Sequence, residues 1–369
     1  MNDWYSNFIQ ILVPFFVSAG LGIAKSSFLV SAFTLTSAVM QPVSGYLVDT
    51  RNVRRLVHIG TLWMGVLLCF SAIIGNYALT LIIVALSGLG TAAFHPQASA
   101  IVASVSGNHK GTYQSIFVAG GNVGLALTPL LLVPFVENFG LESLPWLAIP
   151  AVIMSVFLWT GTPRPEQRRK SESAPLGEAL RKSRGELLKL ISVVSARSLA
   201  YFGFVTFLPL YFVSHSMELS AGSVLIFVML SAGAFGGIVG GIISDRIGRK
   251  PVIVGSLLLA GPLFGLFLIS SGILSYILLF LAGSMLLSSF SVTVVSAQEL
   301  IGKNAATASG LMLGFGVGIG GMGVGLLGII ADNFGIDTTI GILIFLPILA
   351  GLFATLLKKN PISDKQPGQ

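Results

Sequence analysis

Charged residues are scarce in this sequence. Only 9% of its 369 residues are Asp, Glu, Lys or Arg, while 54% are hydrophobic and the mean hydropathy is +0.89. In a water-soluble domain, roughly a quarter of the residues carry charge. The shortage of charge excludes a soluble globular domain and indicates an integral membrane protein.

Cysteine and catalytic motifs are also lacking. Cys69 is the only cysteine, which excludes an intrachain disulfide and a cysteine-based metal site. No HExxH or P-loop motif occurs, and Ser, His and acidic residues do not gather in a catalytic arrangement. The glycine-rich run 310–328 has no strand before it and no acid after it, so it does not indicate dinucleotide binding. We therefore expect no enzyme, no metal and no cofactor.

Long apolar runs are what the chain does contain. A run of about 20 apolar residues can cross a hydrocarbon core of about 30 Å, and twelve such runs occur. The N-terminus lacks the basic region and cleavage site of a signal peptide, so the first helix is expected to be retained. The expected membrane helices are 1–17, 26–48, 56–74, 77–104, 113–134, 143–160, 187–213, 220–244, 251–270, 273–298, 305–330 and 336–357.

The cations gather in alternate loops. The net charge is +7 and the pI is about 9.6, but this charge follows membrane topology, so no nucleic-acid partner is expected. Loops on the opposite side hold acids with one cation, Lys25. Because cytoplasmic loops are rich in Lys and Arg, both termini are predicted to be cytoplasmic. The cationic loops contain Arg51, Arg54, Arg55, Lys110, the cluster in 164–189, Arg246, Arg249, Lys250, Lys303, Lys358 and Lys359.

One polar turn, 241–250, has a weaker copy at 45–55. The acids of the two copies, Asp49 and Asp245, lie 196 residues apart, about half of the chain. This spacing indicates an internal duplication into two six-helix halves, which place a binding site at the midplane between them. We predict an N-terminal bundle at 1–160, a cytoplasmic linker at 161–186 and a C-terminal bundle with a short cytoplasmic tail at 187–369.

The sequence of this turn, Gly-x-x-x-Asp-Arg-x-Gly-Arg-Lys, resembles a loop of major facilitator superfamily transporters. The resemblance implies an all-α membrane fold with twelve helices in two pseudo-symmetric bundles. It also implies a latch that holds the bundles together, whereas a topology signal alone explains the cations but not the glycines and the acids. The latch residues would be Gly45, Asp49, Gly241, Asp245, Arg246, Gly248, Arg249 and Lys250.

Further motifs narrow this resemblance to the fosmidomycin resistance protein family. They are the segments 94–99, 120–124, 297–300 and 330–332. Such proteins are taken to be proton-driven exporters, and fosmidomycin is an anionic phosphonate. The resemblance therefore implies export of a small anionic or amphiphilic compound coupled to protons.

The chain departs from this family at Gln97, where the family usually has Glu, and at Ala100, where a basic residue often stands. Glutamine cannot bind and release a proton, so one coupling carboxylate is missing. The missing carboxylate leaves an alternative, in which the protein is an uptake symporter or uniporter for an anionic metabolite. A more remote alternative is a membrane sensor or scaffold that transports nothing.

Arg197 is the most informative single residue. It lies within an apolar run, where an arginine costs at least about 2.5 kcal/mol and needs water, an acid or a ligand. Its guanidinium can bind a carboxylate or phosphonate through two parallel hydrogen bonds. Asp3, at the equivalent position of the other half, is a candidate partner, and the pair could also be purely structural.

Other polar residues within the expected helices are candidates for the substrate and proton path. His95, Asp3 or Glu299 would carry the proton, although His95 could be a neutral hydrogen-bonded histidine and Glu299 an interfacial acid. Stripes of polar residues can equally serve hydrogen bonding between helices. The remaining candidates are Asn7, Gln41, Gln97, Asn122 and Gln298.

These observations together predict a multi-pass transporter of the cytoplasmic membrane of a prokaryote. Its expected partners are a small-molecule substrate, protons and the lipid bilayer, and we expect a monomer. The glycine-rich run is expected to let its helix pack closely and bend.

Overall fold

The computed structural model describes the chain except residues 52–54, 106–109, 162–175, 302–310 and 359–369. Every regular element in the described part is a helix. In chain order these are α1 (Asn2–Ser6), α2 (Phe8–Ser18), α3 (Ile23–Arg51), α4 (Leu56–Ser71), α5 (Tyr77–Val105), α6 (Lys110–Phe139), η1 (Leu141–Leu147), α7 (Ala148–Gly161), α8 (Leu176–Ser214), α9 (Leu219–Ile247), α10 (Arg249–Leu268), α11 (Ile273–Ile301), η3 (Leu311–Gly316), α13 (Val317–Phe334) and α14 (Ile336–Ala354).

These helices account for the twelve expected membrane crossings. Among the described residues, ten segments are long and apolar enough to span a membrane. The eleventh is α4, an apolar helix of 16 residues, and the twelfth is the pair α1 and α2, which meet at Asn7. The all-α membrane fold predicted from the sequence is confirmed.

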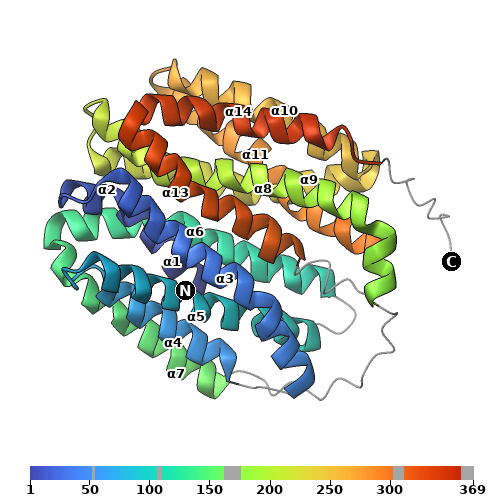
Figure 1. Ribbon diagram of the computed structural model, residues 1–369, viewed down its shortest axis with the longest axis horizontal. Coiled ribbons are helices and arrows are strands. Elements are labelled where there is room, and N and C mark those ends of the chain that lie inside the picture. Colours follow the sequence, from blue (N-terminus) through green and yellow to red (C-terminus); the bar gives the residue numbers. More distant parts are fainter. Residues whose placement is uncertain (52–54, 106–109, 162–175, 302–310, 359–369) are drawn as a thin grey trace.

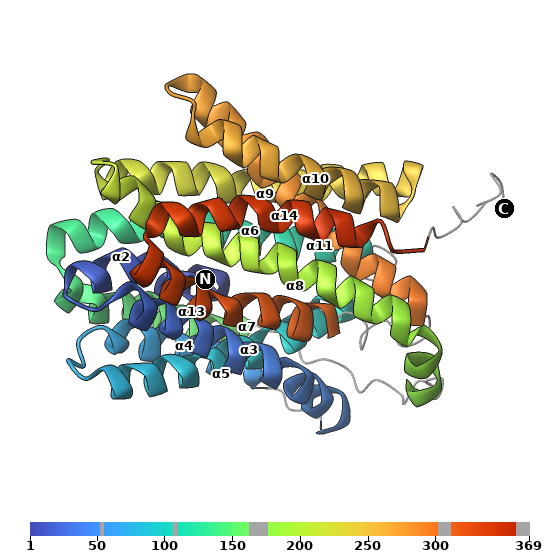
Figure 2. The same ribbon diagram turned by 45° about the horizontal axis from the view of Figure 1, so that its top comes forward.

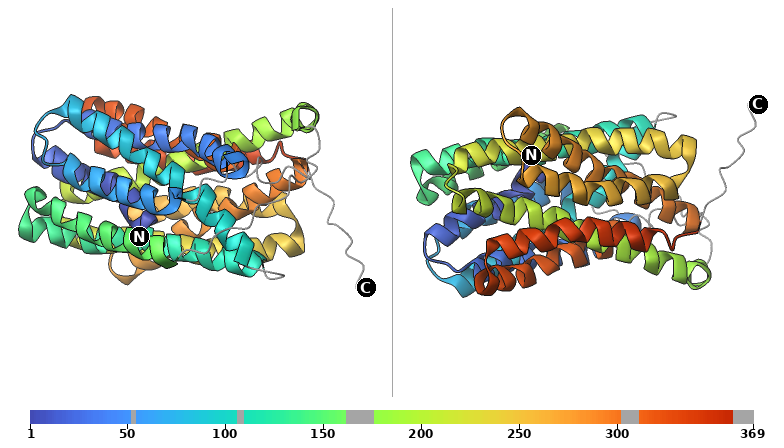
Figure 3. Two further views of the ribbon diagram at one scale, coloured as in Figure 1. Left: turned by 90° about the horizontal axis from the view of Figure 1, so that it is seen from below. Right: turned by 90° about the horizontal axis from the view of Figure 1, so that it is seen from above.

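The helices form two groups that follow the order of the chain. Elements α1 to α7 make one bundle and α8 to α14 the other, and opposite views of the molecule show one bundle each in front (Figures 1 and 3). Each bundle has its own internal packing, as between α4 and α5 or between α9 and α11, and the bundles meet through α3 with α13 and α6 with α9.

Helix α13 lies between α8 of its own bundle and α3 of the other (Figure 2). Glycines on two faces allow this position, because an added Cβ would overlap a neighbouring helix on either side. The close packing expected of the glycine-rich run is therefore present. In α13, Gly318, Gly321, Gly325 and Gly328 face α3, and Gly320 and Gly323 face α8; in the preceding η3, Gly314 faces α3 and Gly316 faces α8.

The two ends of the molecule are named here by the chain. At the linker end α7 ends at Gly161 and α8 begins at Leu176; at the opposite end α2 leads into α3 and α13 into α14. The expected border between linker and second bundle, at residue 187, falls inside α8. Leucines at helical spacing, such as Leu176 and Leu180, continue the helix into the expected linker, and the start of α8 projects past its neighbours (Figure 2).

Candidate functional site

An ion pair joins α1 to α5 in the first bundle. The imidazole Nε2 of His95 lies 3.2 Å from the carboxylate Oδ1 of Asp3, and both side chains are only partly exposed. His95 precedes Pro96, whose ring removes one backbone donor from α5. Two titratable groups in contact inside a membrane bundle can hold and pass a proton.

Glycines of α6 make room for Asp3. A Cβ added at Gly121 would overlap Oδ2 of Asp3, and one added at Gly124 would lie 3.2 Å from the backbone nitrogen of Trp4. The neighbouring Gly120 has open space at the same position. The Gly-Gly-Asn-Val-Gly segment therefore lets α1 lie close against α6, which sets the position of the carboxylate.

Arg197 is the largest fully buried side chain in the described part of the chain, with 2% of its surface exposed. Its Nη2 donates to the Ser198 hydroxyl at 3.2 Å, and its guanidinium carbon lies 4.7 Å from the centre of the Phe290 ring of α11. Within the described residues, Nε and Nη1 have no hydrogen-bond partner. In the structure Asp3 pairs with His95 and not with Arg197, so in the described part of the chain no carboxylate pairs with the guanidinium.

Tyr201 lies near both charged centres. It follows Arg197 by one turn of α8 and lies within electrostatic range of both Arg197 and Asp3. The arginine of the second bundle and the carboxylate of the first bundle therefore share one interior region, where the bundles meet through α2 and α8.

The side chain of Asn7 binds a backbone carbonyl of α6 that lacks its usual donor. Its Nδ2 donates to the carbonyl oxygen of Leu125 at 3.1 Å. That carbonyl would normally accept from the residue four positions later, which is Pro129 and has no N–H. The side chain proposed for the substrate path therefore has a structural partner, which the spacing of proline in the sequence could have revealed. Its Oδ1 is buried without a partner in the described residues.

Gln97 has a similar role at the start of α4. Its Oε1 accepts the backbone N–H of Val57 at 2.7 Å, and the residue is buried. This N–H is one of the donors that a helix N-terminus leaves without an intrahelical acceptor. A glutamine can fill this role as well as a glutamate, because either side chain offers an acceptor oxygen.

The other interior candidates are less engaged. Asn122 is half-buried on α6, and Gln41 donates to Ser37 at 3.4 Å within α3. The side chain of Gln298 lies outside the described part of the chain.

Glu299 belongs to the linker end rather than to the interior. Its Oε1 accepts from Nε and Nη2 of Arg249 at 3.2 and 3.1 Å, and Nη1 of Arg249 donates to Ser244 at 2.7 Å. The pair joins α10 to α11 within the second bundle. Arg249 thus binds an acid of its own bundle, and Gly248, at φ +92°, makes the turn that a residue with a side chain would strain.

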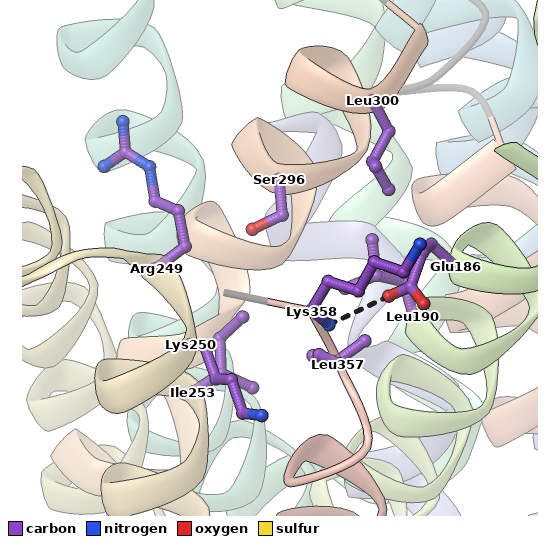
Figure 4. Close-up of a pocket in the computed structure, with 9 residues that line it drawn as sticks. All are labelled: Glu186, Leu190, Arg249, Lys250, Ile253, Ser296, Leu300, Leu357 and Lys358. Atoms are coloured by element: carbon purple, nitrogen blue, oxygen red, sulfur yellow. Dashed lines mark hydrogen bonds between the residues drawn. The ribbon is translucent and has the colours of Figure 1, made fainter. Parts of the chain in front are cut away.

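A second cluster at the linker end holds the end of α14. Nζ of Lys250 donates to the carbonyl of Thr355 at 2.5 Å, and Nζ of Lys189 donates to that of Leu356 at 3.0 Å. The Glu186 carboxylate accepts the backbone N–H of Lys358, as Figure 4 shows beside Arg249 and Lys250. Cations at a helix C-terminus stabilise its free carbonyls.

The remaining latch residues are described only in part. Gly241 lies 3.9 Å from the Ser291 hydroxyl, measured from an added Cβ, and Arg246 is exposed at the end of α9. The side chains of Asp49 and Asp245, and the surroundings of Gly45, lie outside the described part.

Sequence reasoning did not single out Phe290. It lies in an ordinary apolar context, and only the packing of α11 against α8 brings its ring to the Arg197 guanidinium.

The two-bundle architecture and the glycine-lined helix contacts define a membrane protein with two helical bundles. The family model of the Major Facilitator Superfamily matches residues 2–322. The chain belongs to this superfamily.

Two relatives match almost the whole chain. It is 30% identical to the fosmidomycin resistance protein of Escherichia coli (strain K12), over 99% of this chain and 91% of that protein. It is 32% identical to YfnC of Bacillus subtilis (strain 168), an uncharacterised MFS-type transporter, over 98% and 90%.

Solved structures share the fold. A bacterial homologue of the human lysosomal transporter Spinster, in an inward-facing and occupied conformation, superposes with a TM-score of 0.76 at 16% identity. The match covers 96% of this chain and 94% of that one, and the inward-facing, unoccupied conformation matches equally well. The protein is thus a multi-pass membrane transporter, and its substrate is a small molecule.

Proposed function

We propose that this protein is a proton-driven exporter of a small anionic compound, with fosmidomycin-like phosphonates as the first class to test. The observation that carries the proposal is the buried guanidinium of Arg197, of which Nε and Nη1 have no partner in the described part. A buried charge without a partner is costly. An anionic group can accept from either of these unpartnered N–H donors, so binding compensates the charge and selects for an anion.

The proton path begins at the His95 and Asp3 pair. Gln97 cannot titrate and is engaged at the start of α4, so coupling uses the pair 3.2 Å apart instead of a helix α5 carboxylate. Protonation of Asp3 releases its ionic contact with His95. We infer that the change in charge acts on the anion site across the interior, where α2 and α8 of the two bundles meet.

Topology and assembly complete the proposal. By the positive-inside rule the cationic loops favour a cytoplasmic position, in a prokaryote, for both termini and the linker end, and we propose that the chain acts as a monomer. Alternating access follows from rocking one bundle against the other around the interior site.

The test is flux of fosmidomycin in proteoliposomes with and without an imposed pH gradient. The native chain is expected to accumulate the compound against its gradient on the side from which protons leave. Arg197→Ala should lower the rate by about 100-fold, since a charged hydrogen-bond donor to the anion is lost. The matched control is Lys189→Ala, which removes a cation of the same helix at the linker end.

Each contrary result points elsewhere. Transport only down the gradient of the compound would identify a uniporter, and movement with the protons would identify an uptake symporter. Native flux by Arg197→Ala would remove the anion site from the proposal.

A further inference from the structure

At the end opposite the linker, a carboxylate of one bundle binds the start of a helix in the other. The oxygens Oδ1 and Oδ2 of Asp332, near the end of α13, accept the backbone N–H groups of Ile23 and Ala24 at 2.9 Å each. These are the first residues of α3, whose N–H groups have no intrahelical acceptor. A carboxylate there also meets the positive end of the helix dipole. Gly22 allows this approach, since its added Cβ would lie 3.3 Å from Oδ2.

A second contact joins the same two helices about 12 Å deeper, eight residues along α3 at 1.5 Å per residue. The hydroxyl of Ser31 accepts the backbone N–H of Gly325 at 2.8 Å and lies 3.3 Å from the carbonyl oxygen of Gly321 and 2.9 Å from that of Met322. Gly325 and Gly321 are the donor and acceptor of one turn of α13. The hydroxyl of Ser31, in the first bundle, is thus inserted into the backbone hydrogen bonding of α13, in the second bundle.

Between these contacts the helices touch through small residues. An added Cβ at Gly328 would lie 2.6 Å from the Cβ and hydroxyl of Ser27. The Ser27 hydroxyl is buried and has no partner in the described residues. This stretch therefore offers close packing, whereas Asp332 and Ser31 supply the directional hydrogen bonds.

We propose that Asp332 and Ser31 form a clasp that keeps the two bundles closed at the end opposite the linker. The inference rests on the proposed function for its purpose: the clasp must open whenever the interior site faces that end. When the clasp opens, the N–H groups of Ile23 and Ala24 become exposed to water, and the N–H of Gly325 can bond to a carbonyl of its own helix. The clasp therefore favours the closed arrangement over the open one by a modest factor. A larger preference would prevent the gate from reopening in each transport cycle.

The clasp is tested by the reactivity of a cysteine placed under it. In a Cys69→Ser background, Ser27→Cys places a thiol at a position that is fully buried in the closed arrangement. Its rate of reaction with a polar methanethiosulfonate in nanodiscs is proportional to the population of the open state. Asp332→Ala should raise this rate by about fivefold, the effect expected for loss of a helix N-cap. Ser31→Ala should raise it by about two- to threefold.

Matched variants distinguish opening of the clasp from a general loosening of helix packing. Asp337→Ala removes an acid at the same end whose partner, His215, lies in the same bundle. Ser26→Ala removes a buried hydroxyl of α3 whose partner in the described part, the carbonyl of Gly22, lies in the same bundle. Both should leave the rate unchanged. A thiol at Ser87, buried within the first bundle, should keep its low reactivity in all variants.

Two results would overturn the clasp: an unchanged rate in both Asp332→Ala and Ser31→Ala, or an equal rise at position 87. If Asp332→Ala does not fold, Asp332→Asn keeps the size and one acceptor oxygen and should show a smaller rise. The readout needs no substrate. Altered reactivity together with absent fosmidomycin flux would therefore leave the clasp standing and reject the proposed substrate.

Discussion

The two bundles differ in whether their interior charged side chains are paired. In the first bundle Asp3 and His95 face each other at 3.2 Å, and Gly121 gives the carboxylate its space. In the second bundle Arg197 is 2% exposed, and its only hydrogen bond in the described part is to a neighbouring serine. A pair can satisfy itself in the absence of ligand, whereas a lone cation cannot. This contrast supports the proposal that the first bundle exchanges protons and the second binds an anion.

The sharpest way to break this comparison is to make Arg197 neutral. Arg197→Met should abolish transport of an anion, by at least about 100-fold, because the charge that selects the ligand is gone. The ligand-free protein should melt at the same or a higher temperature, since a buried charge costing about 2.5 kcal/mol is removed.

Asp3→Asn should have the opposite effect on stability. It removes one member of a satisfied pair and should lower the melting temperature in detergent. Equal destabilisation by Arg197→Met and Asp3→Asn would show that Arg197 has an equally good partner in the free protein, which contradicts the contrast between the bundles.

Gly121→Ala tests how the pair is positioned. The new methyl group would overlap the Asp3 carboxylate, so α1 must move and the contact with His95 lengthens. We expect a loss of about 1–3 kcal/mol in stability, typical of overpacking, together with loss of proton coupling. Gly120→Ala is the control, because nothing lies within 4 Å of its added Cβ. Coupled transport at the native rate by Gly121→Ala would show that the pair is not needed.

Gln97→Ala tests whether this position is structural. It leaves the buried N–H of Val57 without its acceptor, so we expect a loss of about 1–2 kcal/mol. Gln97→Glu keeps the acceptor and adds a charge near a helix N-terminus, which should leave thermal stability unchanged or slightly raised. Denaturation in detergent at neutral pH measures both. A strong loss on Gln97→Glu would contradict the capping role.

The smallest effect is expected at the linker end. Arg249 and Glu299 form an ion pair whose carboxylate side chain is 40% exposed, so Glu299→Gln should cost less than about 1 kcal/mol and matter less at high salt. Proton-driven flux should persist in this variant. Its loss would return Glu299 to the proton path.

The fold was predictable from the sequence because membrane helices are recognised by their length and hydrophobicity, and because the turn at 241–250 repeats in the other half. The pairing within the site was not. Symmetry between the halves suggested Asp3 for Arg197, but His95 on α5 lies closer, and which charge meets which depends on helix rotation that apolar periodicity does not specify. The role of Asn7 was open to inference, because Pro129 leaves the Leu125 carbonyl free.

Helix α8 carries Arg197 and continues without interruption to Leu176 at the linker end. The 21 residues between them span about 32 Å at 1.5 Å per residue. If α8 moves as a rod, a tilt of about 10° at the arginine displaces Leu176 by about 5 Å. Binding at the proposed interior site would then be amplified into a larger movement at the start of α8. A fluorophore near the start of α8 would turn the protein into an optical reporter of its own substrate.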